Sequence, residues 1–551
     1  MTMPAIKPLS PALAGLLFLL PAGYGTKLKA QTPEAAPAAR TFYVDAHQGN
    51  DSNDGQSSAS AWRSLDKVNA TEFAAGDRIL FKAGSAFAGQ LRPRGSGRLV
   101  NGQPAPVIID MYGQGASPRI DAEGAFEAAL YLHNVEYWEV NNLELTNHGP
   151  IAKALRKGVY VHIEDYGSAN HIHLKNLYVH DVNGTTRKAD GGSGRILWRA
   201  SGEWKRSRLN GLLIEGCHIE RCERNGIIGG GHIRRGADWY PSLNVVIRNN
   251  LIEQVPGDGI VPIACDGALV EHNVVRDGTR LLPEGDAAAG IWPWASDNTV
   301  IQFNEVSGHK APWDAQGFDS DWNCRGTVIQ YNYSHDNEGG FLLICNNGGA
   351  APNIAINDGT IVRYNISVND GIRPHPTSRR GWFSPVFHIS GPVKGTKIYN
   401  NVICVPAKPS PEIDRAMIQL DNWGGPWPED TWFANNICYV EGEARYDWGE
   451  SKNHVFEHNL FFGIHTDGPP DAHAILGDPL FVSPGSAAGF EALKGFLLRE
   501  GSPAIRAGIP ISNNGGRDIF GVPIPSFAPP TIGAHEFVRP GRGPRRQFGA
   551  R

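Results

Sequence analysis

The feature that most constrains this chain is a short motif that returns along most of its length. The common pattern is two or three apolar residues, a polar residue, then an aromatic residue, His or Asn, and finally an Asn followed by another apolar residue. Successive copies place the final Asn at intervals of 23, 31, 28, 33, 36, 35 and 23 residues. The eight copies lie at residues 246–251, 270–274, 300–304, 328–332, 361–365, 398–402, 433–437 and 455–459.

An irregular period with one short β-type segment per copy predicts coils of three strands joined by loops of variable length. A helical array would show 3.6-residue periodicity and a stricter repeat. Stacked coils bring equivalent residues to about 4.8 Å from one another, so an Asn in each coil can hydrogen-bond to the Asn above and below. We therefore expect the repeated Asn residues to be scaffold rather than site.

A second column of residues supports the same architecture. After each repeated Asn comes a Gly followed by an apolar residue. We expect these pairs to open the second strand of each coil, with the Gly allowing a sharp bend. The pairs are Gly226-Ile227, Gly259-Ile260, Gly290-Ile291, Gly317-Phe318 and Gly340-Phe341.

Segments at both ends add a resemblance to a known group of proteins. The opening segments 41–45, 49–55 and 75–81 and the closing segments 478–481, 501–504 and 532–536 resemble those of the pectate-lyase-like superfamily. The resemblance implies an all-β fold, a single-domain right-handed parallel β-helix with three sheets and about a dozen coils. That superfamily contains lyases, hydrolases, epimerases and non-enzymatic adhesins, so the resemblance does not select a reaction.

The termini predict an exported protein. Lys7, the apolar run 12–20 and the small-residue site 28–30 indicate a signal peptide over residues 1–30, with an uncleaved anchor as the alternative. We expect a Pro- and Ala-rich linker at 31–40, the β-helix with its end caps at 41–537 and a Gly- and Arg-rich tail at 538–551. The mature chain is then a secreted or periplasmic monomer without a membrane contact.

Composition narrows the partners. A formal net charge of −5 argues against a nucleic-acid partner, which requires a basic face. The sequence has seven Cys residues and no Cys–x–x–Cys or Cys/His metal spacing. In an exported chain an odd number leaves at least one thiol unpaired, and we favour buried thiols stacked between coils over a disulfide framework.

The candidate site follows from alignment of the second strands. If Ile291 and Phe318 point inward, strand alternation turns Trp292 and Trp294 outward in one coil, with Asp319 and Asp321 beside them in the next. Two positions along a strand separate Cα atoms by about 6.6 Å. Indole faces can stack on sugar rings while carboxylates handle protons.

Further residues are expected to converge on this cleft, over residues 258–342. Asp314 precedes the acid pair, Glu338 lies before the next Gly, and a cluster of acids with few cations must raise some pKa values or bind a cation. A long loop after Asn365, which carries His375, Arg379, Arg380 and His388, is expected to wall one side. The predicted substrate-binding residues are Trp292, Trp294, Trp313, Trp322, His335, Asp258 and Trp382.

Three interpretations of the acids remain open. A glycoside hydrolase would use Asp319 and Asp321 as acid and base, with Glu338 or Asp314 assisting. It would cleave a polysaccharide or oligosaccharide and would require no cofactor. A lyase acting on a uronate polymer would bind Ca²⁺ through Asp314, Asp319 and Asp321. Its base would come from Lys310, Arg325, Arg363 or Arg373.

The third interpretation is a carbohydrate-binding β-helix without turnover, in which the acids are solvated or capping residues. We favour the hydrolase, because Trp residues and acids outnumber local cations and uronate substrates demand Arg or Lys contacts. No Asn-Thr-Asp, Gly-His-Gly or Arg-Ile-Lys signature of the polygalacturonase branch occurs.

Overall fold

The structure of the chain is a computed structural model that describes residues 38–539, apart from 192, 237, 347–356, 379 and 486. The predicted signal peptide, most of the linker and most of the tail lie outside the described residues. The described residues belong to one compact unit, Ala38–Arg551. None of the described helices is long and apolar enough to cross a membrane.

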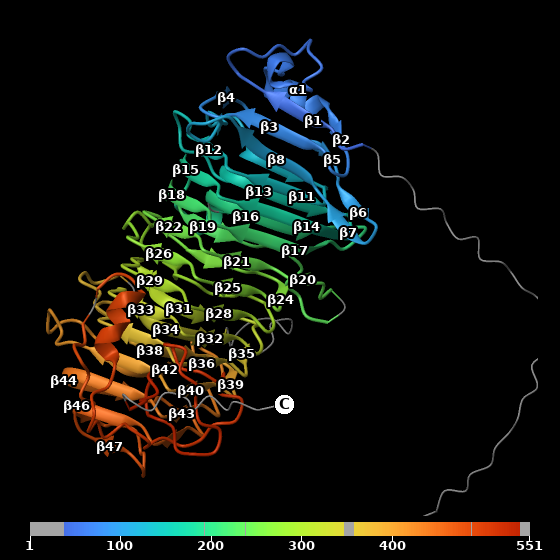
Figure 1. Cartoon of the computed structure of the whole chain (residues 1–551). Coiled ribbons are helices and arrows are strands. Elements are labelled where there is room, and N and C mark those ends of the chain that lie inside the picture. Colours follow the sequence, from blue (N-terminus) through green and yellow to red (C-terminus); the bar gives the residue numbers. More distant parts are fainter. Residues whose placement is uncertain are drawn as a thin grey trace, which may run out of the picture. The chain divides into compact units, whose positions relative to one another are not determined.

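Parallel strands stack coil upon coil from β1 to β47 (Figure 1). The first sheet has fourteen strands in a single path, close to the dozen coils that the repeat predicts. Its strands are β1 (Thr41–Val44), β3 (Arg78–Lys82), β8 (Val107–Tyr112), β11 (Trp138–Asn141), β14 (Ser168–Lys175), β17 (Arg208–Glu215), β21 (Val246–Arg248), β25 (Leu269–Glu271), β28 (Val300–Gln302), β32 (Val328–Gln330), β36 (Ile361–Arg363), β40 (Lys397–Tyr399), β43 (Trp432–Ala434) and β45 (Val455–Glu457).

The second sheet follows the turn that ends each strand of the first. Its strands are β4 (Ala86–Ala88), β9 (Arg119–Asp121), β12 (Glu144–Asn147), β15 (Tyr178–Val182), β18 (His218–Cys222), β22 (Leu251–Glu253), β26 (Val274–Arg276), β29 (Glu305–Ser307), β33 (Tyr333–His335), β37 (Ile366–Val368), β41 (Val402–Val405), β44 (Ile437–Asp447), β46 (Leu460–Thr466) and β47 (Ile475–Leu476).

The third sheet is interrupted where one coil contributes isolated bridge residues in place of a strand. Ile291 pairs with Ile260 on one side and Phe318 on the other, and Trp294 pairs with Ile263. The long strand β44 pairs with both β41 and β42, so the second and third sheets meet at this end. The strands of the third sheet are β10 (Ala128–His133), β13 (Lys157–Glu164), β16 (Gly194–Ser201), β19 (Asn225–Ile228), β23 (Ile260–Val261), β31 (Gln316–Ser320), β34 (Gly340–Cys345), β38 (Phe387–Ser390) and β42 (Ala416–Asp421).

The remaining elements lie in loops and end segments. Short strand pairs are β2 (Glu72–Phe73) with β5 (Arg94–Gly95), β6 (Arg98–Val100) with β7 (Gln103–Ala105), β20 (Ser242–Leu243) with β24 (Cys265–Asp266), β27 (Ala287–Ala288) with β30 (Trp313–Asp314), and β35 (Asn357–Asp358) with β39 (Val393–Lys394). The helices are η1 (Ser58–Ser60), α1 (Leu65–Ala70), η2 (Lys188–Asp190) and η3 (Phe490–Phe496).

The predicted Asn ladder is present and buried. Asn250 donates from Nδ2 to Oδ1 of Asn273 at 2.9 Å and to the carbonyl oxygen of Ile214 in the preceding coil at 3.0 Å. The same pattern then links Asn273, Asn304, Asn332, Asn365, Asn401, Asn436 and Asn459, and the last of these donates to Asp471.

Each amide therefore satisfies its own hydrogen-bonding groups and orphaned backbone groups of its neighbours, which fixes the register between coils. In earlier coils the ladder position is apolar, with Leu143, Leu177 and Cys217, and Asn142 and Asn176 lie one residue before it at positive φ. The repeat motif, extended to residues 140–143 and 174–177, aligns Asn142 and Asn176 with the ladder, and this alignment is wrong by one position.

The Gly column is also present, but for a different reason from the one expected. A Cβ on Gly259 would lie 2.4 Å from the carbonyl oxygen of Gly290, and a Cβ on Gly290 would lie 2.4 Å from that of Gly317. None of these three residues has positive φ. Close approach of one backbone to the next, rather than a sharp bend, therefore excludes a side chain here.

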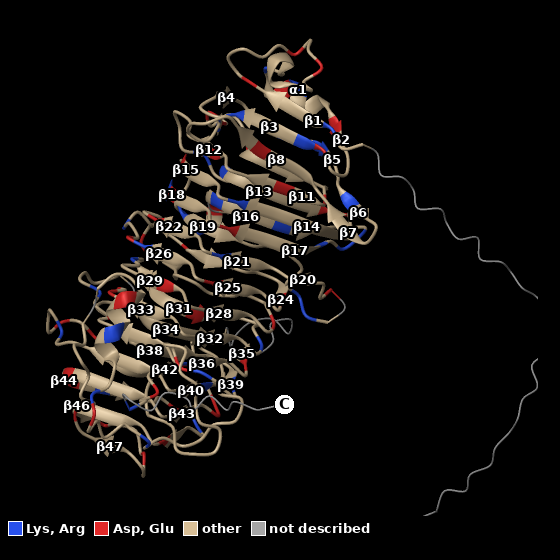
Figure 2. Cartoon of the chain, in the orientation of Figure 1, with Lys and Arg blue, Asp and Glu red and all other residues tan. Residues whose placement is uncertain are grey.

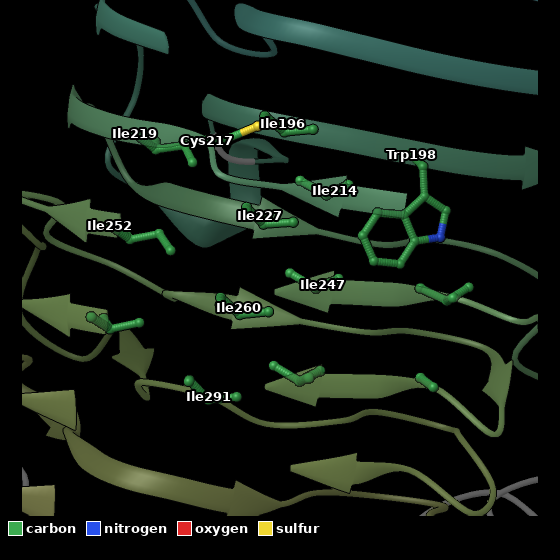
Figure 3. Packing of buried hydrophobic residues seen from close by; sticks show 14 of the residues in the cluster. Ile196, Trp198, Ile214, Cys217, Ile219, Ile227, Ile247, Ile252, Ile260 and Ile291 are labelled. Atoms are coloured by element: carbon green, nitrogen blue, oxygen red, sulfur yellow. The ribbon is translucent and has the colours of Figure 1, made fainter. Parts of the chain in front are cut away.

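The interior of the coils is filled by stacked apolar side chains. Figure 3 shows Ile196, Ile227, Ile260 and Ile291 in one column, with Ile214 above Ile247 in another. All seven Cys residues are buried with free thiols, as the buried-thiol interpretation expects. Acidic and basic residues are interspersed along the coils (Figure 2). The all-β, three-sheet parallel β-helix is therefore confirmed.

The ladder predicts an unequal response at two adjacent residues. Replacement of Asn250 by Ala leaves the Cys217 N–H and the Ile214 carbonyl without their partners. We expect the free energy of unfolding to fall by about 3 kcal/mol, since each orphaned buried group costs about 1–3 kcal/mol. Guanidinium denaturation measures the change. The matched control is Asn249→Gly, because Asn249 is exposed at φ 56°, and its midpoint should stay near that of the parent chain. Equal midpoints for the two variants would contradict the ladder's role.

Candidate active site

The site forms on the outward face of the third sheet. Ile291 pairs with Phe318 and both are fully buried, as predicted, so Trp292 lies beside Asp319 and Trp294 beside Asp321. The next coil departs from the prediction, because Phe318 pairs with Leu342 and not with Phe341. Gly340 has φ 127° and pairs with Gln316, which moves the strand by one residue.

That shift decides which side chains follow the two acids along the sheet. Leu343 pairs with Asp319, and Cys345 then lies beside Asp321. An apolar residue and a thiol therefore border the carboxyls on this side, in place of further charged residues.

A cavity of about 720 Å³ opens over these strands. Five of its lining residues are Trp, which gives it the aromatic walls that sugar rings stack on. Four of those Trp residues were predicted from the sequence, and Trp423 was not. The lining consists of Lys188, Ala287, Trp292, Trp294, Trp313, Asp314, Asp321, Trp322, Leu343, Cys345, Arg380 and Trp423.

Asp321 lines this cavity at the end of β31. Its Oδ1 accepts hydrogen bonds from the backbone N–H of Trp322 at 2.6 Å and from the thiol of Cys345 at 3.2 Å. Burial raises the pKa of Asp321, while these two donors and the charge of Lys188 oppose the shift. Asp321 is therefore the carboxyl of this cluster with donors aimed at its charged form.

Asp319 is more deeply buried than Asp321 and is not among the residues that line the cavity. Its Oδ1 is buried without a hydrogen-bond partner, and ligand atoms of Asp319, Asp321 and Cys345 lie within 4.8 Å of one another. Burial, followed by the charges of Asp321 and Asp314, raises the pKa of Asp319 well above its ordinary value. Asp319 is thus held as the neutral acid beside a carboxyl that carries the charge.

Asp314 reaches the cavity from a different element. It ends β30, which pairs with β27, and has φ 59°. Burial raises its pKa to about 6, with the charge of Lys188 opposing the shift. Two carboxyls thus face one cavity in different surroundings, one near the point of half-protonation at mildly acidic pH and one supplied with donors.

The loop that carries Asp314 is fixed by a buried arginine. Arg373 donates from Nη2 to the carbonyl oxygen of Asp314 at 2.9 Å, from Nε to that of Phe383 at 3.2 Å, and from Nη1 to that of Ala311. Its guanidinium therefore ties the loop before Asp314 to the segment that carries Arg380. Arg373 was considered as a lyase base in the sequence, but all these contacts are donations to backbone carbonyls.

Lys188, like Trp423, lines the cavity and was not predicted from the sequence. It begins η2, in a loop before β16, and its backbone N–H donates to Asp286 at 2.7 Å. The ammonium lies 5.4 Å from the centroid of the Trp292 ring. Asp258, which is buried 3.8 Å from Arg224, raises the pKa of Lys188. Asp258 thus belongs to the charge network behind the cavity, and no repeat in the sequence points to Lys188.

The structure places three predicted site residues away from this cavity. Glu338 lines a neighbouring cavity of about 230 Å³ and pairs with Arg280, because it precedes β34 and strand alternation does not fix its side chain. His335 lies in the second sheet, where it contacts Glu305 at 3.2 Å and Asp336 at 2.7 Å. Trp382 is half-buried before β38 and is not among the residues that line the cavity.

The predicted wall from the long loop is present in part. Arg380 lines the cavity and lies 5.4 Å from the Trp313 ring centroid. His388 is buried and packs edge-on against Trp423, with ring centroids 5.5 Å apart. His375 lines the neighbouring cavity with Glu338, and Arg379 is outside the described residues.

The donor set bears on the calcium alternative. Asp319 and Asp321 supply carboxylate oxygens, but the third ligand atom within 4.8 Å of theirs is the Cys345 thiol. Asp314, the third acid of the calcium alternative, lines the cavity but does not belong to this group. Ca²⁺ prefers six to eight oxygen ligands. Among the described residues, none of the four predicted lyase bases lines the cavity, whose only cations are Lys188 and Arg380.

Comparisons with known proteins agree with the fold. A family model described as a right handed beta helix region matches residues 209–372. A lacto-N-biosidase of Bifidobacterium longum subsp. longum is 27% identical over 584 residues, with 89% of this chain covered. The chain spans about a third, 34%, of the length of that relative.

Two crystal structures of the GH136 lacto-N-biosidase from Eubacterium ramulus are also similar. The native protein is 24% identical with a TM-score of 0.51, and the selenomethionine derivative is 25% identical with a TM-score of 0.52. Each comparison covers 70% of this chain and 67% of the other. The chain is thus a right-handed parallel β-helix protein similar to carbohydrate-active enzymes.

The raised pKa of Asp319 predicts how stability responds to pH. An unfolded Asp has a pKa of about 3.9 and releases its proton as pH rises, whereas folded Asp319 keeps its proton. Unfolding therefore becomes more favourable as pH rises through this window. Asp319→Asn removes this contribution. We therefore expect the Tm of the variant, relative to that of the parent chain, to increase from pH 4 to pH 8. Thermal melts at several pH values measure the difference, and a gap that stays constant with pH would contradict the assignment.

Proposed function

We propose that this chain is a glycoside hydrolase that uses Asp314 and Asp321 as its acid and base. The observation that carries the proposal is that these two carboxyls, in different electrostatic surroundings, line a single Trp-walled cavity. Carboxyl pairs whose pKa values are separated by their surroundings are how glycosidases assign the two roles. The pair differs from the one expected from the sequence, in which Asp319 took the place of Asp314.

The electrostatic surroundings of Asp314 and Asp321 decide which of them acts as acid and which as base. Asp314, with a pKa of about 6, is protonated at mildly acidic pH and is suited to protonate the leaving oxygen of the glycosidic bond. Asp321 accepts two hydrogen bonds and lies near Lys188, so it is suited to act in its ionised form as base or nucleophile. Asp319, buried and neutral next to Asp321, is a positioning residue.

The residues that line the cavity can bind the sugar substrate. Trp292, Trp294 and the three other Trp residues offer faces for sugar rings, and Lys188 and Arg380 offer donors to hydroxyl and carbonyl oxygens. A cavity of this volume suits a bound oligosaccharide. Lysines and arginines that would neutralise a row of uronates are few here, which favours neutral sugars over a uronate polymer.

The relatives suggest the substrate class. Both named proteins are lacto-N-biosidases, so we propose that this chain releases a disaccharide such as lacto-N-biose from an oligosaccharide. The proposal includes export to the periplasm or medium, with removal of residues 1–30, and action as a monomer. A panel of aryl glycosides, with lacto-N-biose, single sugars and other disaccharides as the glycone, tests the substrate.

The two acids predict separate losses of activity. Asp314→Asn and Asp321→Asn should each lower kcat/KM on the best substrate of the panel by at least about 100-fold, which is the range of acid–base contributions. Asp319→Asn copies the neutral acid and should keep most of the activity. Equal inactivation by all three substitutions would place Asp319 in the chemistry, and full activity of Asp314→Asn or Asp321→Asn would overturn the proposal.

The pH profile adds a second readout. The acid must be protonated, so kcat/KM should fall as pH rises above about 6, and the base must be ionised, so it should fall again at low pH. Asp314→Asn should remove the alkaline limb from the residual activity. Ultraviolet absorbance from new double bonds, followed with and without a calcium chelator, would instead identify a lyase.

Arg373 predicts a positioning effect on Asp314. Arg373→Met keeps the aliphatic volume but removes donors to the loop that holds Asp314, so we expect kcat to fall at least about tenfold. The charge of Arg373 opposes the rise in the pKa of Asp314, so the alkaline limb should also move to higher pH. The control is Arg280→Met, because Arg280 pairs with Glu338 in the neighbouring cavity. An unchanged limb and kcat in Arg373→Met would contradict the role.

A further inference from the structure

A second cluster of ligating side chains lies on the outward face of the third sheet, in coils far before the candidate active site. His133 in β10 pairs in register with His162 in β13, and Glu164 lies two residues further along β13 on the same face. Ligand atoms of these three side chains all lie within 4.8 Å of one another. The strands β16, β19 and β23 separate this cluster from the coils that carry Trp292 and Asp321.

Neighbouring groups hold the His162 ring and the Glu164 backbone in place. The hydroxyl of Tyr131 is 3.2 Å from Nδ1 of His162, and the hydroxyl of Ser201 is 3.3 Å from Nε2. Asn134 accepts the backbone N–H of Glu164 at 2.8 Å and donates to its carbonyl oxygen at 3.0 Å. Whichever nitrogen of His162 binds a ligand, the other keeps a hydroxyl partner, which is the outer-sphere support that metal-binding His residues use.

Two arginines lie near the cluster. Arg92 lies 4.8 Å from the ring centroid of Tyr131, and Arg199 in β16 pairs in register with His162. His133 and His162 would bind a metal through neutral imidazole nitrogens.

Two other groups of His and Glu on the coils serve as comparisons, and their acids already have cations. Glu139, beside His171 and His173, contacts the ammonium of Lys175 at 2.9 Å.

In the third group Glu253, beside His218, contacts Arg276 at 2.9 Å, and Glu220 pairs with Arg221. Within the part of the chain that the structure describes, no such ion pair is recorded for Glu164, whose side chain contacts the Ser201 hydroxyl at 3.5 Å.

We propose that His133, His162 and Glu164 bind Zn²⁺. Two imidazole nitrogens and one carboxylate oxygen are ligands that Zn²⁺ accepts, whereas Ca²⁺ and Mg²⁺ prefer oxygen ligands throughout. His133 also lines a cavity of about 990 Å³ with Arg92, Asn134 and Glu123, and Glu164 is exposed, so water or a small ligand can reach the cluster. The ion would join β10 to β13 and stabilise these two coils.

Zinc titration of the tag-free full chain, stripped with a chelator and followed by calorimetry at pH 7.5, tests the proposal. We expect one Zn²⁺ per chain, a higher Tm with Zn²⁺, and at least a tenfold weaker affinity in His133→Gln. Glu164→Gln changes an exposed side chain and gives the same readout if the His variant does not fold. The matched control is His171→Gln with His173→Gln, which should bind Zn²⁺ as the parent chain does.

Three outcomes would overturn the proposal. They are no measurable binding of Zn²⁺, binding that both His133→Gln and Glu164→Gln leave unchanged, and binding that the control pair abolishes. Hydrolysis of the best aryl glycoside by His133→Gln should match that of the parent chain, because the cluster is remote from Asp314 and Asp321. The zinc result is therefore independent of the proposed hydrolase activity.

Discussion

The register between successive coils is the constraint on which the rest of this structure depends. Buried Asn side chains pass hydrogen bonds from coil to coil from Asn250 to Asn459, and each bond also satisfies a backbone group that the turn leaves free. Backbones approach so closely at Gly259 and Gly290 that a Cβ would touch the next carbonyl oxygen. A slip of one residue would break the ladder and turn every outward side chain inward.

The candidate site is a direct consequence of that register. One coil presents Trp292 and Trp294, the next presents Asp319 and Asp321, and the side chains stand in line because Ile291 and Phe318 pack inward. The sheet supplies fixed positions, and loops supply what surrounds them. Lys188 and Asp314 both lie in loops. Together they make the electrostatic surroundings of the Asp314 carboxyl different from those of the Asp321 carboxyl.

Features that repeat from coil to coil could be predicted from the sequence, whereas site residues that lie in loops could not. The ladder, the inward Ile291 and the outward Trp292 follow from local pattern and strand alternation. The predicted strand pairing was wrong at Gly340, where positive φ shifts it by one residue. Glu338 lies in the neighbouring cavity, because its position before the strand lets its side chain pair with Arg280. Nothing periodic marks Lys188, because its position depends on the path of a loop that precedes β16. Asp319 was predicted to be catalytic because strand alternation shows to which face a side chain points. It does not show how deeply that side chain is buried.

The proposed hydrolase binds a sugar between Asp314 and Asp321, with Asp319 buried outside the cavity lining. A crystal structure of Asp314→Asn with an uncleaved oligosaccharide tests this most directly. The account predicts a scissile glycosidic oxygen within hydrogen-bonding distance of residue 314, the anomeric carbon facing the Asp321 carboxyl, and a sugar ring stacked on at least one of the five Trp residues. An oligosaccharide bound instead in the cavity of Glu338 and Arg280, or one whose anomeric carbon faces Asp319, would contradict it.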